Sequence, residues 1–302
     1  YVGAAGLASC NVGSLTGGAG AAGSAGDFGG GGGGGGSGLF VSASGATVTV
    51  TGAQGGNGGA GGAGATTSGA AGSPGAGITV TGTGNTILAS GTVAPGTGAT
   101  TSDAVDFQGG NNILDLTSAT VNGSVRMTAA DSTLRGTGTI SDSVLINAGT
   151  IAPGHSIGTI NSVFLDIRGG TYNAEIDAAA VTADLFNVTG PSVAPGGSAW
   201  ITGATVNISN LAGTPAVGQT FTLLTAAPGG VSGTFTLGTL PAGVSASLSY
   251  PGGTSVVLTI TAVAAPVPAG PASIPTLSEW GLATLSLLVA GGMLWQRRRG
   301  RV

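Results

Sequence analysis

Aspartate is the residue type through which this sequence could most readily do chemistry. Five aspartates stand between positions 103 and 142, namely Asp103, Asp106, Asp115, Asp131 and Asp142. Carboxylates brought together from neighbouring strands can act as general acid and base on a polysaccharide. The five are spaced by 3 to 16 residues, and Trp200 is the only tryptophan before residue 274 that could stack on a sugar. We therefore expect structural or solvating acids and predict no catalytic residue; a polysaccharide lyase or hydrolase is the alternative.

Residues that bind metals or act as nucleophiles are equally sparse. His155 is the only histidine, and it precedes Ser156; consecutive side chains point apart, so the two form no nucleophile–base pair. Cys10 is the only cysteine, which excludes an intramolecular disulfide and a cysteine-based zinc site. Asn112 stands where calcium-binding nonapeptide repeats carry an aspartate, and an amide is a poorer calcium ligand. We predict no metal site and no cofactor.

Charge is scarce and unevenly placed. Only 6% of the residues are charged, lysine is absent, and residues before 274 hold three arginines against ten acidic residues, a formal charge of −7. Phosphate contacts need clustered cations, so an acidic, lysine-free body is a poor match for nucleic acid. We predict no nucleic-acid partner.

The elements that would position these residues are short strands. Thr, Val, Ile, Ser and Gly dominate residues 39–262, and the apolar runs are too short for ordinary helices. Gly, Asn and Pro-Gly turns separate the runs. We expect strands at residues 39–41, 47–51, 78–81, 86–88, 113–116, 119–121, 143–146, 159–160 and 163–167. The body is predicted to be all-β.

Two architectures join many short strands by regular turns, a β-sandwich and a parallel β-solenoid. Residues 91–96 (GTVAPG) and 149–154 (GTIAPG) are near copies, and this self-similarity favours the solenoid. In a solenoid, stacked coils share one core because no coil can bury its inner face alone. Asparagine at the turns can form hydrogen bonds along the stack. We predict a solenoid, with the sandwich as the alternative.

A family resemblance supports that prediction. Residues 105–116 (VDFQGGNNILDL), 149–160 (GTIAPGHSIGTI) and 217–235 (VGQTFTLLTAAPGGVSGTF) resemble autotransporter passenger domains. The resemblance covers residues 78–262 and implies a right-handed parallel β-helix exposed at the cell surface. After Ile260 the sequence passes into a proline-rich stretch instead of the strands of an outer-membrane barrel, so the resemblance ends there.

Glycine is concentrated at the N-terminal end. Of 63 glycines, 30 lie in residues 1–80, and residues 29–36 are eight glycines in a row. An unstructured linker is the first interpretation; packed polyglycine helices with three residues per turn are the alternative, because only glycine permits such close backbone packing. Strands at 39–41 and 47–51 would form an early coil, and the second glycine tract would bulge from it as a loop.

The C-terminal tail has a different pattern. Residues 274–295 (IPTLSEWGLATLSLLVAGGMLW) carry no charge after Glu279, and as a helix they would span about 33 Å. Trp280 and Trp295 flank the apolar run, and four arginines follow it: Arg297, Arg298, Arg299 and Arg301. We predict a transmembrane helix in the inner membrane, with the arginine cluster as a cytoplasmic anchor.

The same tail resembles a known sorting signal. Ile274, Pro275, Thr276, Leu277, Trp280 and Gly281 match the defining positions of the IPTLxxWG C-terminal signal of Gram-negative bacteria. The resemblance implies that an exosortase-family enzyme recognises these residues as a substrate motif. It also implies a cell-envelope protein that ends at the cell surface or in the medium.

These observations divide the chain as follows. We expect a glycine-rich head (1–38), short β segments with a glycine-rich loop (39–77), solenoid repeats (78–190), a closing β segment (191–262), a Pro/Ala linker (263–273) and the sorting signal (274–302). The chain begins with Tyr1, so we expect an export signal outside this sequence. The predicted function is that of an exported, non-enzymatic surface or matrix protein, adhesin-like, with extracellular polysaccharide as a possible partner.

Overall fold

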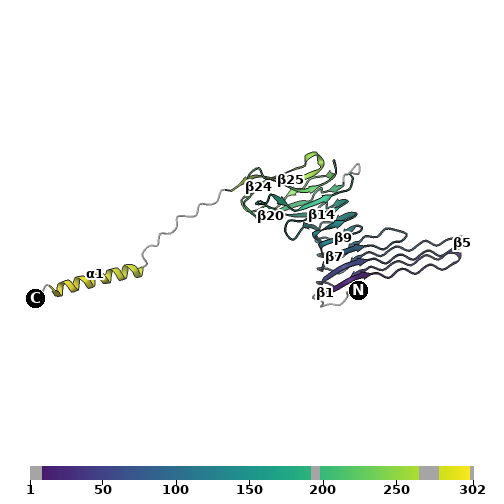
Figure 1. Ribbon diagram of the computed structural model, residues 1–302, viewed down its shortest axis with the longest axis horizontal. Helices are drawn as coiled ribbons and strands as arrows, with labels where there is room; N and C mark the ends of the chain where they lie inside the picture. Colours follow the sequence, from purple (N-terminus) through teal and green to yellow (C-terminus); the bar gives the residue numbers. More distant parts are fainter. Residues whose placement is uncertain (1–8, 192–197, 265–278, 300–302) are drawn as a thin grey trace. The chain divides into compact units, whose positions relative to one another are not determined.

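The computed structural model describes residues 9–191, 198–264 and 279–299. It separates into two units, Tyr1–Val263 and Ala264–Val302, which are treated one by one. Within its described residues the first unit contains strands and a single 3-10 turn, η1 (Pro251–Gly253); the second contains the helix α1 (Glu279–Arg299) (Figure 1). The all-β prediction for the body is confirmed.

The first unit is a stack of coils with parallel strand pairing. One side, face A, is an eight-stranded sheet of short strands that all pair in parallel. Its strands are β3 (Leu39–Val41), β6 (Ile78–Val80), β8 (Val105–Phe107), β10 (Val125–Met127), β12 (Ser143–Ile146), β15 (Phe164–Asp166), β19 (Ala199–Trp200) and β22 (Val231–Ser232). The parallel stacking agrees with the predicted solenoid; its right-handed winding stays a prediction.

A larger, bent sheet forms the other two sides. Its strands are β1 (Ser9–Thr16), β4 (Thr47–Gln54), β7 (Thr86–Ala94), β9 (Ile113–Val121), β11 (Thr133–Ile140), β13 (Thr150–Pro153), β14 (Thr159–Ser162), β16 (Thr171–Asp177), β17 (Thr182–Ala183), β18 (Leu185–Val188), β20 (Thr205–Ala212), β21 (Thr220–Thr225), β23 (Thr236–Leu237), β24 (Val244–Ser249) and β25 (Ser255–Val263). The first part of β11 pairs with β13 and the second with β14, so each coil turns a corner here. We call the side before the corner face B and the side after it face C.

Alternation along the strands builds the core. On face B, every second position points inward and stacks from coil to coil, giving the buried column Val48, Ile87, Leu114, Leu134, Ile151, Tyr172 and Val206. Each such apolar side chain contributes about 1.5–3 kcal/mol on burial. The preceding position faces outward, and it is threonine in all coils from β4 to β23 except at Ile113 in β9. Outward β-branched residues suit the pleated strand.

Asparagines form a ladder inside the corner between faces A and B. Asn85 and Asn112 are fully buried, and Asn85 Nδ2 donates to Asn112 Oδ1 at 3.1 Å. Asn85 Oδ1 also accepts from the backbone N–H of Ala46 at 2.9 Å, and Asn112 Nδ2 donates to the carbonyl of Gly109 at 2.7 Å. The hydrogen bonds predicted for turn asparagines are confirmed.

The two near copies in the sequence are not structurally equivalent. Residues 91–96 lie in and after the second part of β7, where Thr92 pairs with Thr120 on face C. Residues 149–154 contain β13 instead, and Thr150 pairs with Thr133 on face B. The repetition that favoured the solenoid therefore comes from two segments on different faces, and the structure agrees with that prediction in its parallel β stacking.

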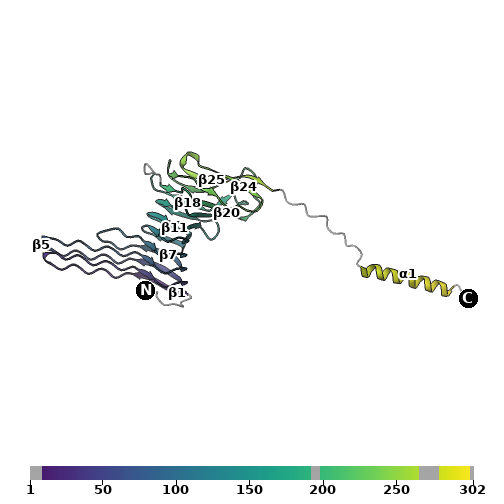
Figure 2. The same ribbon diagram turned by 180° about the vertical axis from the view of Figure 1, so that it is seen from behind.

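The glycine-rich runs are ordered, so the linker interpretation is wrong and the polyglycine alternative is correct. Backbone hydrogen bonds recur at every third residue: Gly17, Gly20 and Gly23 donate to Gln54, Asn57 and Ala60. This period is that of a helix with three residues per turn. The runs extend side by side from the purple end of the coil stack, and the short sheet of β2 (Gly26–Phe28) and β5 (Gly64–Thr67) lies at their far end (Figures 1 and 2). We call residues 17–38 and 55–77 the glycine arm.

Antiparallel pairing ends the larger sheet on its C-terminal side. β25 pairs antiparallel with β21 and with β24, in contrast to the parallel coils before them. Val256, Leu258 and Ile260 of β25 are buried against the core. The chain then leaves the first unit after Val263.

The tail helix α1 is the segment for which a membrane crossing was predicted. Among the residues that the structure describes, no helix is both long enough and apolar enough to cross a membrane. Between Glu279 and Arg297 the apolar residues are interrupted by Thr, Ser, Gly and Gln, which lower the mean hydropathy, and three arginines fill the last turn. The predicted transmembrane helix and the inner-membrane and cytoplasmic placement derived from it are therefore not supported.

Candidate functional site

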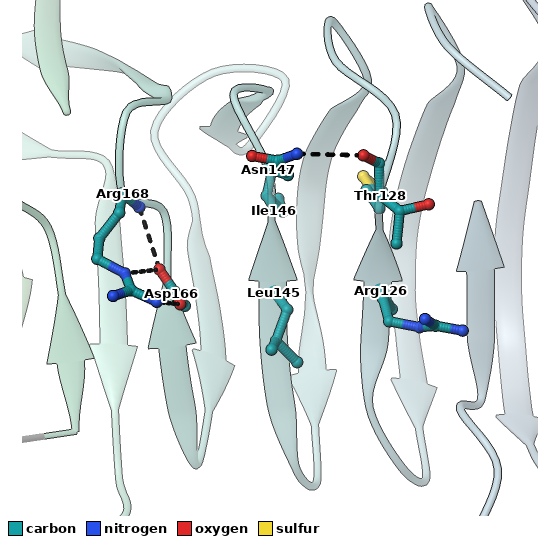
Figure 3. A pocket seen from close by; sticks show the side chains of 8 residues that line it. Arg126, Thr128, Leu145, Ile146, Asn147, Asp166 and Arg168 are labelled. Atoms are coloured by element: carbon teal, nitrogen blue, oxygen red, sulfur yellow. Dashed lines mark hydrogen bonds and ion pairs between the residues drawn. The ribbon is translucent and has the colours of Figure 1, made fainter. Parts of the chain in front are cut away.

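An open depression of about 490 Å³ lies on face A. Arg126, Leu145 and Asp166 belong to β10, β12 and β15, and the pairing register places them side by side. Outward residues just beyond the strands complete the lining, and Asn147 Nδ2 donates to the carbonyl of Thr128 at 3.3 Å (Figure 3). The floor is thus an exposed leucine between two charged positions.

Ion pairs neutralise both arginines of this depression. Arg168 Nη2 lies 2.6 Å from Asp166 Oδ2, and its guanidinium is 4.6 Å from the centre of the Trp200 ring. Arg126 Nε lies 2.6 Å from Asp103 Oδ2. Burial opposes the charge of Arg126, but hydrogen bonding and attraction from Asp103 outweigh it and raise the pKa of Arg126. The depression therefore has no free cation to hold an anionic ligand.

A second hollow, of about 480 Å³, lies on face B and has a mixed polar and apolar lining. We call it the face B groove. It crosses β11, β13, β16 and β20, and its polar side chains are Arg135, His155, Asn173, Glu175, Asp184, Asn207, Ser209 and Thr239. Pairing of β16 with β20 places Asn173 beside Asn207 and Glu175 beside Ser209.

At one end of the groove a buried carboxylate joins two basic side chains. Asp115 has a side chain only 2% exposed; its Oδ2 lies 2.7 Å from Arg135 Nη2 and its Oδ1 lies 2.7 Å from His155 Nε2. Asp115 Oδ1 accepts no hydrogen bond from any described residue, so its contact with His155 is a close approach of the two groups rather than a hydrogen bond. The cross-strand register explains the first pair, because Asp115 and Arg135 are direct neighbours on β9 and β11.

Asp184 lies at the base of the groove and is almost fully buried. Its Oδ1 accepts the backbone N–H of Gly158 and its Oδ2 that of Glu175, both at 2.8 Å. Burial raises the pKa of Asp184 to about 7; the two backbone donors oppose this shift, and the charge of Glu175 adds to it. The Asp184 carboxylate therefore joins β16 to the segment just before β14.

The aspartates singled out in the sequence do not form one site. Asp103, Asp106 and Asp142 line a small polar hollow of about 280 Å³ beside Arg126. Asp115 contacts Arg135 and His155, which line the face B groove, and Asp131 sits in a turn with φ 65°. Across the described ranges, no three His, Cys, Asp or Glu side chains are placed to hold a metal ion.

Sequence reasoning missed the groove residues Asn173, Glu175, Asp184 and Asn207. Asn173 and Glu175 lie on β16, Asn207 lies on β20 and Asp184 lies between β17 and β18, so the four are spread over 34 positions. No local sequence pattern links them. The sequence predicted only that His155 forms no nucleophile–base pair with Ser156. The structure gives it a carboxylate partner two coils away in sequence.

The sorting motif is only partly within the described residues. Ile274, Pro275, Thr276 and Leu277 lie outside them, whereas Trp280 and Gly281 belong to the first turn of α1. Arg297, Arg298 and Arg299 form the last turn, where positive charge complements the helix dipole. The Arg299 guanidinium lies 3.8 Å from the centre of the Trp295 ring. Arg301 is also outside the described part.

Comparison with known proteins bears on this tail. No curated protein matches the chain. Residues 272–299 match the family model of the IPTL-CTERM motif, and the C-terminal tail of this chain is therefore an IPTL-CTERM sorting signal.

Proposed function

We propose that this chain is an exported protein of the Gram-negative cell envelope that an exosortase-type enzyme processes at its tail. Its body would then act outside the cell as a non-enzymatic, adhesin-like or matrix component. The observation that carries the proposal is the match of residues 272–299 to the IPTL-CTERM motif. Such a signal is a substrate for another protein, so the tail needs no chemistry of its own.

The body supports a role in display. Stacked coils share one core and extend by repetition, and the glycine arm projects from one end of the stack as packed backbone. Phe28 lies at the tip of the arm with 73% of its surface exposed, next to Asp27. Asp27 is also the only charged residue before Asp103. A neutral arm ending in an acid and an aromatic ring suits contact with another surface.

The groove chemistry supports a non-enzymatic role. A general acid or base must reach the proton that it transfers. Asp115 Oδ2 accepts from Arg135 and its Oδ1 lies 2.7 Å from His155 Nε2, and both oxygens of Asp184 accept backbone N–H groups. Of the carboxylates in or beside the groove, Glu175 alone accepts no hydrogen bond or ion pair from a described residue, and one carboxylate does not make the pair used in glycoside hydrolysis.

A secreted polysaccharide lyase or hydrolase is the second candidate. It is favoured by one observation, the raised pKa of Asp184 close to Glu175 in a polar groove. Assays of the full chain for release of reducing ends or unsaturated sugars would separate the two functions. Cleavage that Glu175→Gln abolishes would establish the enzyme and refute the non-enzymatic proposal.

Processing is tested on the C-terminus of the mature protein. The full chain, preceded by an export signal, is expressed in cells with and without the sorting enzyme, and the mature product is weighed by mass spectrometry. We expect loss of the α1 residues only where the enzyme is present. Pro275→Ala should block that loss, whereas Pro271→Ala, just outside the matched residues, should not. A wild-type product that retains Arg297 in cells with active enzyme would refute the proposal.

A further inference from the structure

The face B groove runs across the strands and therefore along the axis of the coil stack. It spans four neighbouring strands, β11, β13, β16 and β20. Strands in a sheet lie about 4.8 Å apart, so the groove floor is on the order of 14 Å long. An elongated ligand with a short repeat is the shape that matches it.

The groove offers hydrogen-bonding groups that the fold leaves free. Asn207 Nδ2 donates to Asn173 Oδ1 at 3.0 Å, which orients the exposed Asn173 amide and leaves its Nδ2 to donate outward. The Glu175 carboxylate accepts no hydrogen bond from any described residue, and Ser209 beside it is exposed. A donor, an acceptor and a hydroxyl thus line neighbouring positions along the groove.

Charge and polarity restrict the class of ligand. Arg135 and Asp115 cancel one another, and Glu175 adds a negative charge within a body of formal charge −7. Anionic polymers are therefore repelled. A peptide would need apolar anchor pockets, and the apolar lining is limited to small or buried residues such as Ala152 and Ile208. Hydroxyl groups, which both donate and accept, fit the free groups best.

We propose that the face B groove binds a linear, uncharged polysaccharide whose chain lies along the coil stack. Asn173 and Glu175 hold its hydroxyl groups, and Asn207 and Asp184 position those two residues. Asp184 does so by accepting the Glu175 N–H, and Asn207 by accepting the Thr239 N–H and donating to Asn173. The statement that the glycan is bound without being cleaved rests on the proposed non-enzymatic function.

The test measures binding of the full chain by affinity electrophoresis in gels that contain a soluble neutral polysaccharide. Mixed-linkage β-glucan, galactomannan and dextran serve as neutral probes, and alginate as the anionic comparison. We expect retardation by at least one neutral probe and none by alginate. Glu175→Gln and Asn173→Ala should each weaken binding about 5- to 10-fold, the size of one or two lost hydrogen bonds.

The chain offers a matched control on face C. Asn161 Oδ1 accepts from Asn187 Nδ2 at 2.9 Å, as Asn173 accepts from Asn207 on face B. Asn161→Ala therefore loses the same ladder bond and should leave glycan binding unchanged. Ser209→Ala is a second groove variant, expected to weaken binding without touching an internal hydrogen bond.

Three results would overturn the proposal. The first is that no neutral probe retards the wild type, and the second is that alginate retards it more strongly than the neutral probes do. The third is that Asn161→Ala and Asn173→Ala weaken glycan binding equally. Sugar release is measured in parallel. Cleavage with intact groove binding would refute the non-enzymatic function alone, so the two failures are distinguishable.

Discussion

Gly56 packs against the carbonyl oxygen of Gly18 so closely that a Cβ on Gly56 would overlap that oxygen. The Gly56 N–H donates to Gly36 at 2.7 Å, and its carbonyl accepts from Gly75 at 2.9 Å. One glycine is therefore in contact with three other runs of the glycine arm. The low complexity of the sequence here reflects close backbone packing.

Replacing Gly56 with alanine should unfold the arm locally. The added methyl group meets backbone atoms, which cannot rotate away as a side chain can, and overpacking of this kind costs about 1–3 kcal/mol or more. We expect faster amide hydrogen exchange across residues 17–38 and 55–77, with the coil stack from β8 onward unchanged. Hydrogen exchange followed by mass spectrometry measures both.

Gly18→Ala is the matched control, because a Cβ on Gly18 would have no atom within 4 Å. It should leave exchange unchanged or slow it slightly, since alanine restricts the unfolded chain. If both variants loosened the arm equally, the packed polyglycine arrangement would be wrong.

The sequence predicted the short strands of the coil stack, whereas it left the structure of the glycine arm open between two alternatives. Strands at 39–41 and 143–146 match β3 and β12, because turn signals bracket short apolar runs. For residues 17–38 composition allowed both a linker and packed helices. Whether the segment is a linker or a packed helix depends on whether other glycine runs lie beside it. That depends on tertiary structure, and the local sequence pattern does not show it.

Asn85 should be the most costly polar residue to remove from the coil stack. Truncation to alanine would leave the Ala46 N–H and the Ala43 carbonyl buried without partners, because they bond to Asn85 at 2.9 and 2.8 Å. Each unsatisfied group costs about 1–3 kcal/mol, so we expect a loss of roughly 2–5 kcal/mol of unfolding free energy. Urea unfolding measures it. Asn161→Ala, in a half-buried ladder, should lose under about 1.5 kcal/mol; equal losses would contradict the importance of burial.

Asp184 should make the unfolding free energy depend on pH. Its pKa is raised from 3.8 to about 7 by folding, so between these values the folded chain binds more proton than the unfolded chain. Stability from this group is therefore fully present below about pH 4, falls as the pH rises towards 7, and is lost above it. One proton gives a slope of at most ~1.4 kcal/mol per pH unit.

Asp184→Asn removes the titration and should flatten that slope. At low pH the variant is also less stable, because its amide N–H₂ faces a backbone donor that the carboxylate accepted. The observable is the slope of unfolding free energy against pH from 4 to 7, which is separate from the overall loss. An unchanged slope in the variant would show that another group titrates.

The groove residues were beyond sequence reasoning for a different reason. Asp115 and Arg135 lie 20 positions apart, and only the coil length, which varies along the chain, makes them neighbours on β9 and β11. Asn173 and Asn207 are 34 positions apart for the same reason. Because the coils differ in length, the sequence alone does not show which residues are neighbours on adjacent strands; the pairing register is needed.

His155→Ala should destabilise the turn after β13 although the histidine side chain is 52% exposed. The substitution removes the contact of His155 Nε2 with the buried Asp115 Oδ1, 2.7 Å away, and loss of the polar neighbour of a buried carboxylate oxygen costs about 1–3 kcal/mol. His155→Gln carries an amide N–H that can reach the same oxygen, so it should recover part of the loss. Thermal unfolding at fixed pH compares the three chains. If alanine were as stable as the wild type, water would satisfy Asp115 and the contact would add little to the fold.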